Sequence, residues 1–289
     1  MGKSKRIKAC LTALYVFAVG MTLATFFDFK LSAYLTHLTT EPLTITVPNF
    51  TLAFEIIGEW PALLMGGFAA AIIMRAFLKV KKPIGYIGAA GSALVLLCVI
   101  YFAAHGSFED VNEDLGTAAK IISVVLTLVI AAAIAFIAMK LPEKTARGFL
   151  VPSIVCIVML GCVMVGAQGL KIVWGRVRLK EMIMAGDTSL FMPWYKPNFF
   201  SGHHSFPSGH TVNASSLGLL PLFYSKNFCK RFPHAKKITY AAIIAWSAFM
   251  AFTRLLAGAH FLSDVLCGAL IGFVAVIVAD IIMQKISEA

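Results

Sequence analysis

Apolar residues fill long stretches of this chain, and polar residues are concentrated in the short segments between them. A helix needs about 20 mostly apolar residues to cross the hydrocarbon core of a bilayer. Eight stretches approach or exceed that length, at residues 9–27, 56–78, 83–104, 119–139, 148–170, 208–225, 238–256 and 260–283. The pattern therefore predicts an all-α integral membrane protein, a multi-span helical bundle with about eight transmembrane helices.

The composition agrees with this prediction. Of the 289 residues, 59% are hydrophobic and 13% are charged, whereas ordinary soluble domains have about 45–50% apolar and about 25% charged residues. A soluble domain, a disordered chain and a disulfide scaffold are thereby excluded. The net charge of +11 would suggest nucleic acid in a soluble protein. Here basic loops at a membrane surface explain it, and no nucleic-acid partner is expected.

The distribution of basic residues predicts an orientation. Cytoplasmic loops are enriched in Lys and Arg. If the N-terminus is cytoplasmic, most of the 25 Lys and Arg residues fall on the cytoplasmic side. The opposite side includes the acidic loop of residues 105–116. The main exception is a basic cluster after the fifth span and at the end of the seventh, and this exception needs a functional reason.

Polar residues at the ends of four spans converge on the extracytoplasmic face in this topology. Lys171 follows the fifth span, His210 begins the sixth, and Arg254 ends the seventh. His260 and Asp264 begin the eighth. Ionisable residues at the membrane boundary are costly to bury and indicate a functional site.

The spacing of these residues favours phosphate chemistry. Lys171 and Arg178 are seven apart, so on a helix they share one face and can grip a phosphate. Residues 206–211 are predicted to form a turn that enters a helix, where free N–H groups bind anions. His260 and Asp264, four apart on a helix, suit an imidazole oriented by a carboxylate. Together they predict phosphoryl transfer without a metal or other cofactor.

These residues resemble the three motifs of the type-2 phosphatidic acid phosphatase family. The motifs are Lys171-x6-Arg178, Pro207-Ser208-Gly209-His210 and Thr253-Arg254-x5-His260-x3-Asp264. Two departures are Leu179, where the family has proline, and Thr253, where it has serine. The resemblance extends from Lys171 to Asp264, in the order and internal spacing that the family uses.

The resemblance implies a role for each matching residue. His260 would be the nucleophile that becomes phosphohistidine, Asp264 would orient it, and His210 would protonate the leaving group. The phosphate oxygens would be bound by Lys171, Arg178, Ser208, Gly209 and Arg254. The family core has fewer spans than the eight predicted here. We therefore expect residues 1–147 to be N-terminal transmembrane helices, partly an extra module, and residues 148–289 to be the phosphatase core.

The sequence thus predicts a membrane lipid phosphatase with its site on the extracytoplasmic face. The predicted site recognises the phosphomonoester or pyrophosphate of a lipid and not the lipid tail. The alternatives are a lipid phosphotransferase, a soluble sugar-phosphate phosphatase of the same superfamily, and a non-catalytic membrane transporter. We expect a cell-membrane protein whose partners are the bilayer and the lipid substrate.

Other polar residues have simpler interpretations. Lys171 and Arg178 alone could be an interfacial pair that reaches the headgroups. His203 and His204 are expected at the substrate mouth, with a zinc site as the less favoured alternative. The long connection of residues 172–206 is expected to form a lip over the site. A positive rim or a headgroup-facing surface is expected for Arg176, Lys180 and Lys196, and access to water near span ends for Asp28, Glu59 and Asp280.

Overall fold

The computed structural model describes residues 3–109 and 117–288, and the predicted acidic loop lies largely outside them. The fold is helical, as predicted, with a small antiparallel hairpin that pairs Thr39 with Thr44. The first half contains α1 (Lys3–Leu35), β1 (Thr39–Thr40), β2 (Leu43–Thr44), α2 (Phe50–Ile57), α3 (Trp60–Leu78), α4 (Pro83–Glu109) and α5 (Thr117–Lys140). The second half contains α6 (Glu143–Trp174), α7 (Leu179–Ala185), η1 (Thr188–Leu190), α8 (Gly209–Ser216), η2 (Leu217–Phe223), α9 (Lys226–Arg231), α10 (Ala235–Leu256) and α11 (Leu262–Glu288).

Seven helical stretches within the described residues are long and apolar enough to cross a membrane. They correspond to seven of the eight predicted spans. The remaining one, at 208–225, is not a continuous α-helix: α8 ends at Ser216, and a 3₁₀ helix that contains Pro221 follows. Proline lacks the N–H that an α-helix uses. A 3₁₀ helix rises about 2.0 Å per residue, against about 1.5 Å in an α-helix. This segment is therefore longer than an α-helix of the same number of residues.

The chain forms two compact units. The first unit comprises Met1–Glu55, Cys162–Ser216 and Ala242–Ile277, and the second comprises Ile56–Gly161, Leu217–Ala241 and Val278–Ala289. Every residue of the three sequence motifs lies in the first unit. The first 55 residues belong to this unit too, so α1, the hairpin and most of α2 are grouped with the motifs.

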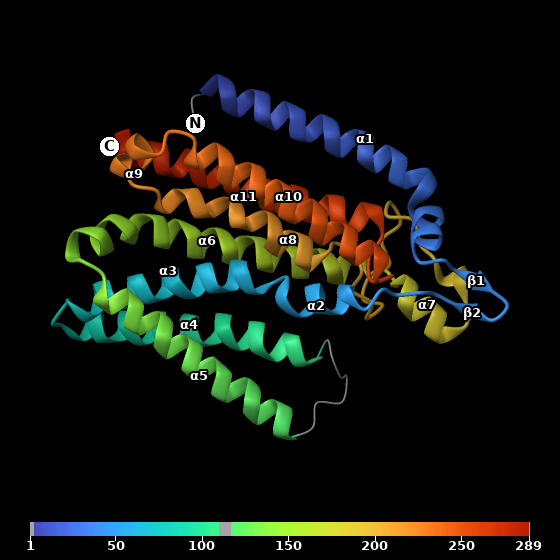
Figure 1. Cartoon of the computed structure of the whole chain (residues 1–289), viewed down its shortest axis with the longest axis horizontal. Coiled ribbons are helices and arrows are strands. Elements are labelled where there is room, and N and C mark those ends of the chain that lie inside the picture. Colours follow the sequence, from blue (N-terminus) through green and yellow to red (C-terminus); the bar gives the residue numbers. More distant parts are fainter. Residues whose placement is uncertain (1–2, 110–116, 289) are drawn as a thin grey trace. The chain divides into compact units, whose positions relative to one another are not determined.

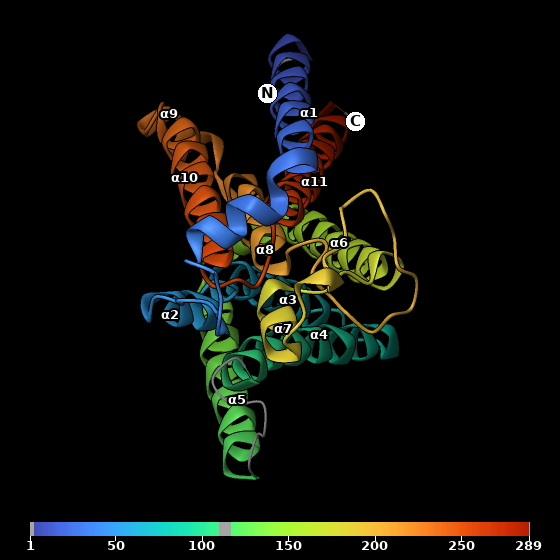
Figure 2. The same ribbon diagram turned by 90° about the vertical axis from the view of Figure 1, so that its right-hand side faces the viewer.

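In the first unit, α8 lies between α6 and α10 (Figures 1 and 2). The hairpin lies beside α7, and Ile45, directly after β2, packs on an apolar cluster of Val177, Leu179, Met182 and Phe261. This cluster joins the segment after α6 to the segment before α11. The first and third motifs, which are far apart in the sequence, therefore pack against the same apolar cluster.

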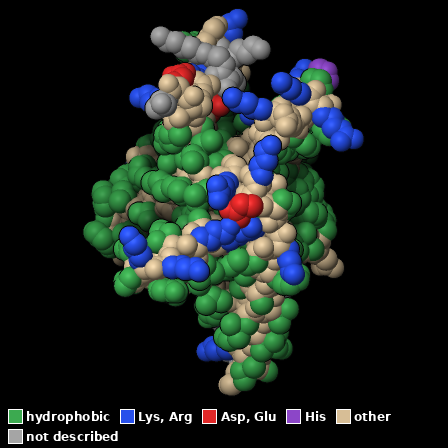
Figure 3. Space-filling model, turned by 90° about the vertical axis from the view of Figure 1, so that its left-hand side faces the viewer, with side chains coloured by type: hydrophobic (Ala, Val, Ile, Leu, Met, Phe, Trp, Pro, Cys, Tyr) green, Lys and Arg blue, Asp and Glu red, His purple; other side chains and the backbone are tan. Residues whose placement is uncertain are grey.

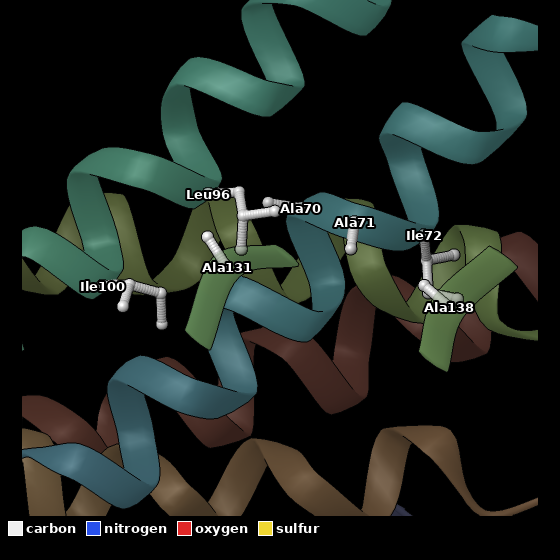
Figure 4. Close-up of a cluster of buried hydrophobic side chains, with 7 residues drawn as sticks. All are labelled: Ala70, Ala71, Ile72, Leu96, Ile100, Ala131 and Ala138. Carbon is white, nitrogen blue, oxygen red and sulfur yellow. The ribbon is translucent and has the colours of Figure 1, made fainter. Parts of the chain in front are cut away.

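The second unit has a core of small and aliphatic side chains. Its buried cluster comes from α3, α4 and α5 (Figure 4) and consists of Ala70, Ala71, Ile72, Leu96, Ile100, Ala131 and Ala138. Small residues allow helix backbones to approach closely, which is how helices pack in lipid.

At the end of α3, basic side chains surround one carboxylate of the second unit. Glu143 accepts from Arg75, Lys79 and Arg147. Lys and Arg side chains are also the prevailing charged groups on the face drawn in Figure 3. Such a surface is typical of a boundary with anionic headgroups.

Candidate active site

The first motif turns sharply where α6 ends. Lys171 lies in the last turn of α6, which ends at Trp174. Gly175 has a φ of +46°, and a Cβ atom there would lie 2.0 Å from the carbonyl oxygen of Asn198, so only glycine fits. Arg178 is extended, with a φ of −81° and a ψ of 154°. The prediction that Lys171 and Arg178 share one helix face is therefore wrong, because the helix ends between them.

Leu179, at the position where the related motif has proline, has a structural role. It begins α7 and is fully buried in the apolar cluster beside Phe261. In addition, Lys180 N donates to Gly258 O at 3.0 Å. The leucine thus anchors the segment that carries Arg178, although it cannot fix φ as proline would.

Glu181 connects Arg178 to His203, the neighbour of His204 in the sequence. Its Oε2 accepts from the backbone N of Arg178 at 3.1 Å and lies 3.0 Å from His203 Nδ1. Burial and the positive charges of Lys171 and Arg178 lower the pKa of His204. His204 therefore lies in the field of the same cations. Within the described residues, no group of three or more His, Cys, Asp and Glu side chains could hold a metal ion.

The second motif begins α8 and is fixed by backbone contacts with α11. Ser208 is fully buried, and its N–H donates to Asp264 O at 3.0 Å. A Cβ atom at Gly268, one turn further along α11, would lie 2.6 Å from Ser208 O. Glycine at this position lets the two backbones touch, so it sets the place of Gly209 and His210.

Two residues of α2 contact the second and third motifs. His210 Nε2 lies 2.9 Å from the carbonyl oxygen of Glu55. Arg254, in the last turn of α10 and fully buried, donates from Nη2 to Thr51 O at 2.7 Å. Its Nη1 lies 3.3 Å from Glu55 Oε1. No pattern of residues indicates that a carboxylate from the N-terminal half would pair with this arginine.

The two residues predicted to form a histidine–carboxylate pair are close, but they are not stacked on one helix. His260 lies in the turn before α11, and Asp264 lies in the first turn of α11. His260 Nδ1 is 3.6 Å from Asp264 Oδ2 and only 2.7 Å from the carbonyl oxygen of Ser205. Since a carbonyl can only accept, Nδ1 carries the proton and the lone pair of the neutral ring lies on Nε2.

Ser205, which the sequence analysis did not single out, connects this pair. Its Oγ donates to Asp264 Oδ2 at 2.6 Å, while its carbonyl oxygen holds His260. Ser205 thus contacts both members of the pair. The contact depends on a backbone carbonyl, which any residue supplies, so no side-chain pattern could have predicted it.

Comparison with known proteins agrees with the motifs. Residues 149–288 match the PAP2 superfamily. We call residues 149–288 the PAP2 region. The chain is also 32% identical over 93 residues to phosphatidylglycerophosphatase B of Escherichia coli K12, and equally to the protein of that name from Shigella flexneri. Each match covers 32% of this chain and 33% of the relative. No solved structure matches the chain.

His260 lies in a buried position within the PAP2 region. Its burial is the main reason why its pKa falls to about 4, and Arg178 and Lys171 lower it further, against the opposing effect of Asp264. The imidazole is thus neutral near pH 7. Because both cations of the first motif act on this ring, the first and third motifs converge on His260.

Residues outside the PAP2 region complete the surroundings of the motifs. Asp28 of α1 is 3% exposed and pairs with Arg176, which is 1% exposed. The expectations that Asp28 reaches water and that Arg176 belongs to a surface rim are therefore wrong. An ionisable residue inside an apolar run indicates a functional site. The sequence analysis instead explained Asp28 by access to water near the end of a span.

Proposed function

We propose that this protein is a membrane lipid phosphatase that works through a phosphohistidine intermediate on His260. The observation that carries the proposal is the state of His260: its Nδ1 is fixed on Ser205 O, and its ring is neutral beside Lys171 and Arg178. A neutral imidazole with a free lone pair on Nε2 is a nucleophile, and two adjacent cations suit a phosphate.

The reaction would proceed in two displacements. In the first, the Nε2 lone pair of His260 forms a bond to phosphorus, the bond to the lipid oxygen breaks, and His210 gives that oxygen a proton. In the second, water attacks the phosphohistidine, loses a proton to His210, and returns the electron pair to Nε2. Lys171, Arg178 and Arg254, with Ser208 and the backbone at Gly209, would hold the equatorial oxygens.

We propose a lipid phosphomonoester as the substrate class, since the named relative is a phosphatidylglycerophosphatase. Cationic side chains occupy the role that a divalent ion has in metal-dependent phosphatases, so we expect activity without added metal. The distribution of basic residues in the loops favours a site on the extracytoplasmic face of the cell membrane.

The test is phosphate release by the purified chain from a panel of lipid monophosphates and pyrophosphates, with glucose 6-phosphate as the soluble comparison. We expect release from lipid phosphates, unaffected by EDTA, and none from His260→Ala. Release only when an alcohol acceptor is added would indicate a phosphotransferase, and preference for the sugar phosphate would indicate the soluble-substrate alternative. Loss of activity on chelation would contradict the metal-free mechanism.

Sidedness has a separate test. Lys196 is exposed in the segment between α7 and α8, so a single cysteine placed there, with the native cysteines replaced, should react with a membrane-impermeant reagent in intact cells. Reaction only after permeabilisation would place the site in the cytoplasm.

A further inference from the structure

A buried cluster of three charged side chains lies behind His260. Arg176 Nη1 donates to Asp264 Oδ1 at 2.7 Å, and its Nη2 donates to Asp28 Oδ2 at 2.9 Å. All three side chains are at most 3% exposed. Asp28 comes from α1, so this cluster joins a helix outside the PAP2 region to the carboxylate beside the candidate nucleophile.

The cluster is held rigidly. Arg176 also donates from Nε to Met192 O at 2.8 Å, and its guanidinium lies 4.3 Å from the ring centre of Phe261. Asp28 Oδ1 accepts from the backbone N–H of Ser263 at 2.9 Å. Asp28 therefore contacts both the arginine and the backbone at the start of α11, between His260 and Asp264.

The charges of the cluster do not cancel. Two carboxylates face one guanidinium, so the ionised cluster has one negative charge in excess. A neutral imidazole that forms a bond through Nε2 while Nδ1 keeps its proton becomes cationic. The excess negative charge is thus located where positive charge develops in the reaction, and interactions of this kind lower the barrier when they are fixed in advance.

We propose that Asp28 is a positioning residue for the phosphoryl transfer: through Arg176 and Ser263 it holds Asp264 in place, and it supplies the charge that stabilises the cationic, phosphorylated imidazole of His260. This inference rests on the proposed function. It assigns to α1 a part in the reaction that the matched PAP2 region does not contain.

The alternative is that Asp28 only neutralises a buried arginine. Removing one partner of a buried ion pair is destabilising, so lost activity alone would not separate the two roles. Vanadate and inorganic phosphate do separate them. Vanadate bonded to Nε2 makes the ring cationic, as the intermediate does, whereas phosphate bound by the cations leaves the ring neutral.

The experiment compares Asp28→Asn with wild type in the full chain, with concentrations corrected for folded protein. Loss of one charge-assisted interaction corresponds to a decrease of about 10- to 100-fold. We expect kcat to fall and the vanadate inhibition constant to rise by such factors, while KM and the phosphate inhibition constant change by less than about threefold. Asp28→Glu, which keeps the charge, should recover part of both losses.

Ser32→Ala is the matched control, because Ser32 is also buried one turn further along α1 and its hydroxyl has no hydrogen-bond partner among the described residues. It should behave as wild type. An active wild type with an equally active Asp28→Asn, or a variant in which vanadate and phosphate weaken together, would overturn this inference and leave the proposed function intact. A wild type that releases no phosphate would overturn the proposed function, and this inference with it.

Discussion

The two compact units of this protein have opposite kinds of interior. In the second unit, α3, α4 and α5 meet through alanine, leucine and isoleucine side chains. In the first unit, the largest fully buried side chains include Arg176 and Arg254, and Asp264 is buried with them. Apolar packing is sufficient to hold helices together in lipid, so the second unit shows what stability alone requires.

Charges buried in the first unit need another explanation. Removing two charges from water costs several kcal/mol per ion, and their attraction often only offsets this cost. The arginines, carboxylates and histidines of the first unit are therefore retained for something other than stability. Their arrangement around His260 suits the proposed phosphoryl transfer. The comparison between the units predicts where mutations act on turnover and where they act only on folding.

The largest effect should come from His260 and His210 of the first unit, whose substitutions should have different effects. His260→Ala removes the proposed nucleophile, so turnover should fall by about 10⁴-fold or more for every substrate. His210→Ala removes the proposed proton donor. It should cost about 10²–10⁴-fold with an alkoxide leaving group, and much less with nitrophenyl phosphate, whose leaving group needs no proton.

The measurement is turnover on both substrates, together with acid-quenched labelling. Acid-labile, base-stable phosphate should be recovered on His260 in the wild type and should be missing in His260→Ala. Label mapped to His210, or normal turnover by His260→Ala, would reverse the assignment of roles.

The helical fold and the identity of the motif residues could be predicted from the sequence. Runs of apolar residues fix the spans because lipid requires them, and seven of eight were found as long helices. The remaining span was misjudged because hydropathy does not distinguish an α-helix from a 3₁₀ continuation at Pro221. The spacing of Lys171 and Arg178 was misleading in a similar way, since Gly175 ends the helix between them.

The supporting residues of the site could not be predicted, for two physical reasons. Ser205 and Thr51 act through backbone carbonyls, which leave no trace in residue type. Asp28 and Glu55 act from helices that are distant in sequence, and only the tertiary fold brings them to Arg176 and Arg254. Motif spacing reports local geometry, whereas these contacts are long-range.

An intermediate effect should come from the same substitution made in each unit. In Gly268→Ala the new Cβ would lie 2.6 Å from Ser208 O, which is backbone of the second motif. In Gly67→Ala it would meet the side-chain ends of Ile100 and Leu96 at 3.0 and 3.2 Å. Side chains can give way more easily than backbone, so Gly268→Ala should displace His210 and lower kcat by about 10- to 100-fold, the cost of a displacement of about 1 Å.

Gly67→Ala should leave the turnover of folded protein within about twofold and change the free energy of unfolding by about 1 kcal/mol or less, since the alanine gains helix propensity while it crowds its neighbours. Gly91→Ala is the control, because nothing lies within 4 Å of its new Cβ. It should be stabilising by up to about 1 kcal/mol. Turnover and thermal unfolding of all three variants decide the comparison, and a large loss of turnover in Gly67→Ala would contradict it.

The smallest effect should be that of moderate acid on His260. Burial disfavours its charged form and lowers its pKa from 6.5 to about 4, so protonation, which would remove the nucleophilic lone pair, begins only near that pH. Between pH 7 and pH 5 the neutral fraction of His260 should fall by only about a tenth, whereas the neutral fraction of an unperturbed histidine would fall about 25-fold. The measurement is kcat/KM of His210→Ala on nitrophenyl phosphate, corrected for ionisation of the substrate, because this variant lacks the second titrating histidine. A loss of kcat/KM with a midpoint near pH 6.5 would contradict this prediction. It would show that water reaches His260 and that the ring is less buried than its distances from Ser205 and Asp264 indicate.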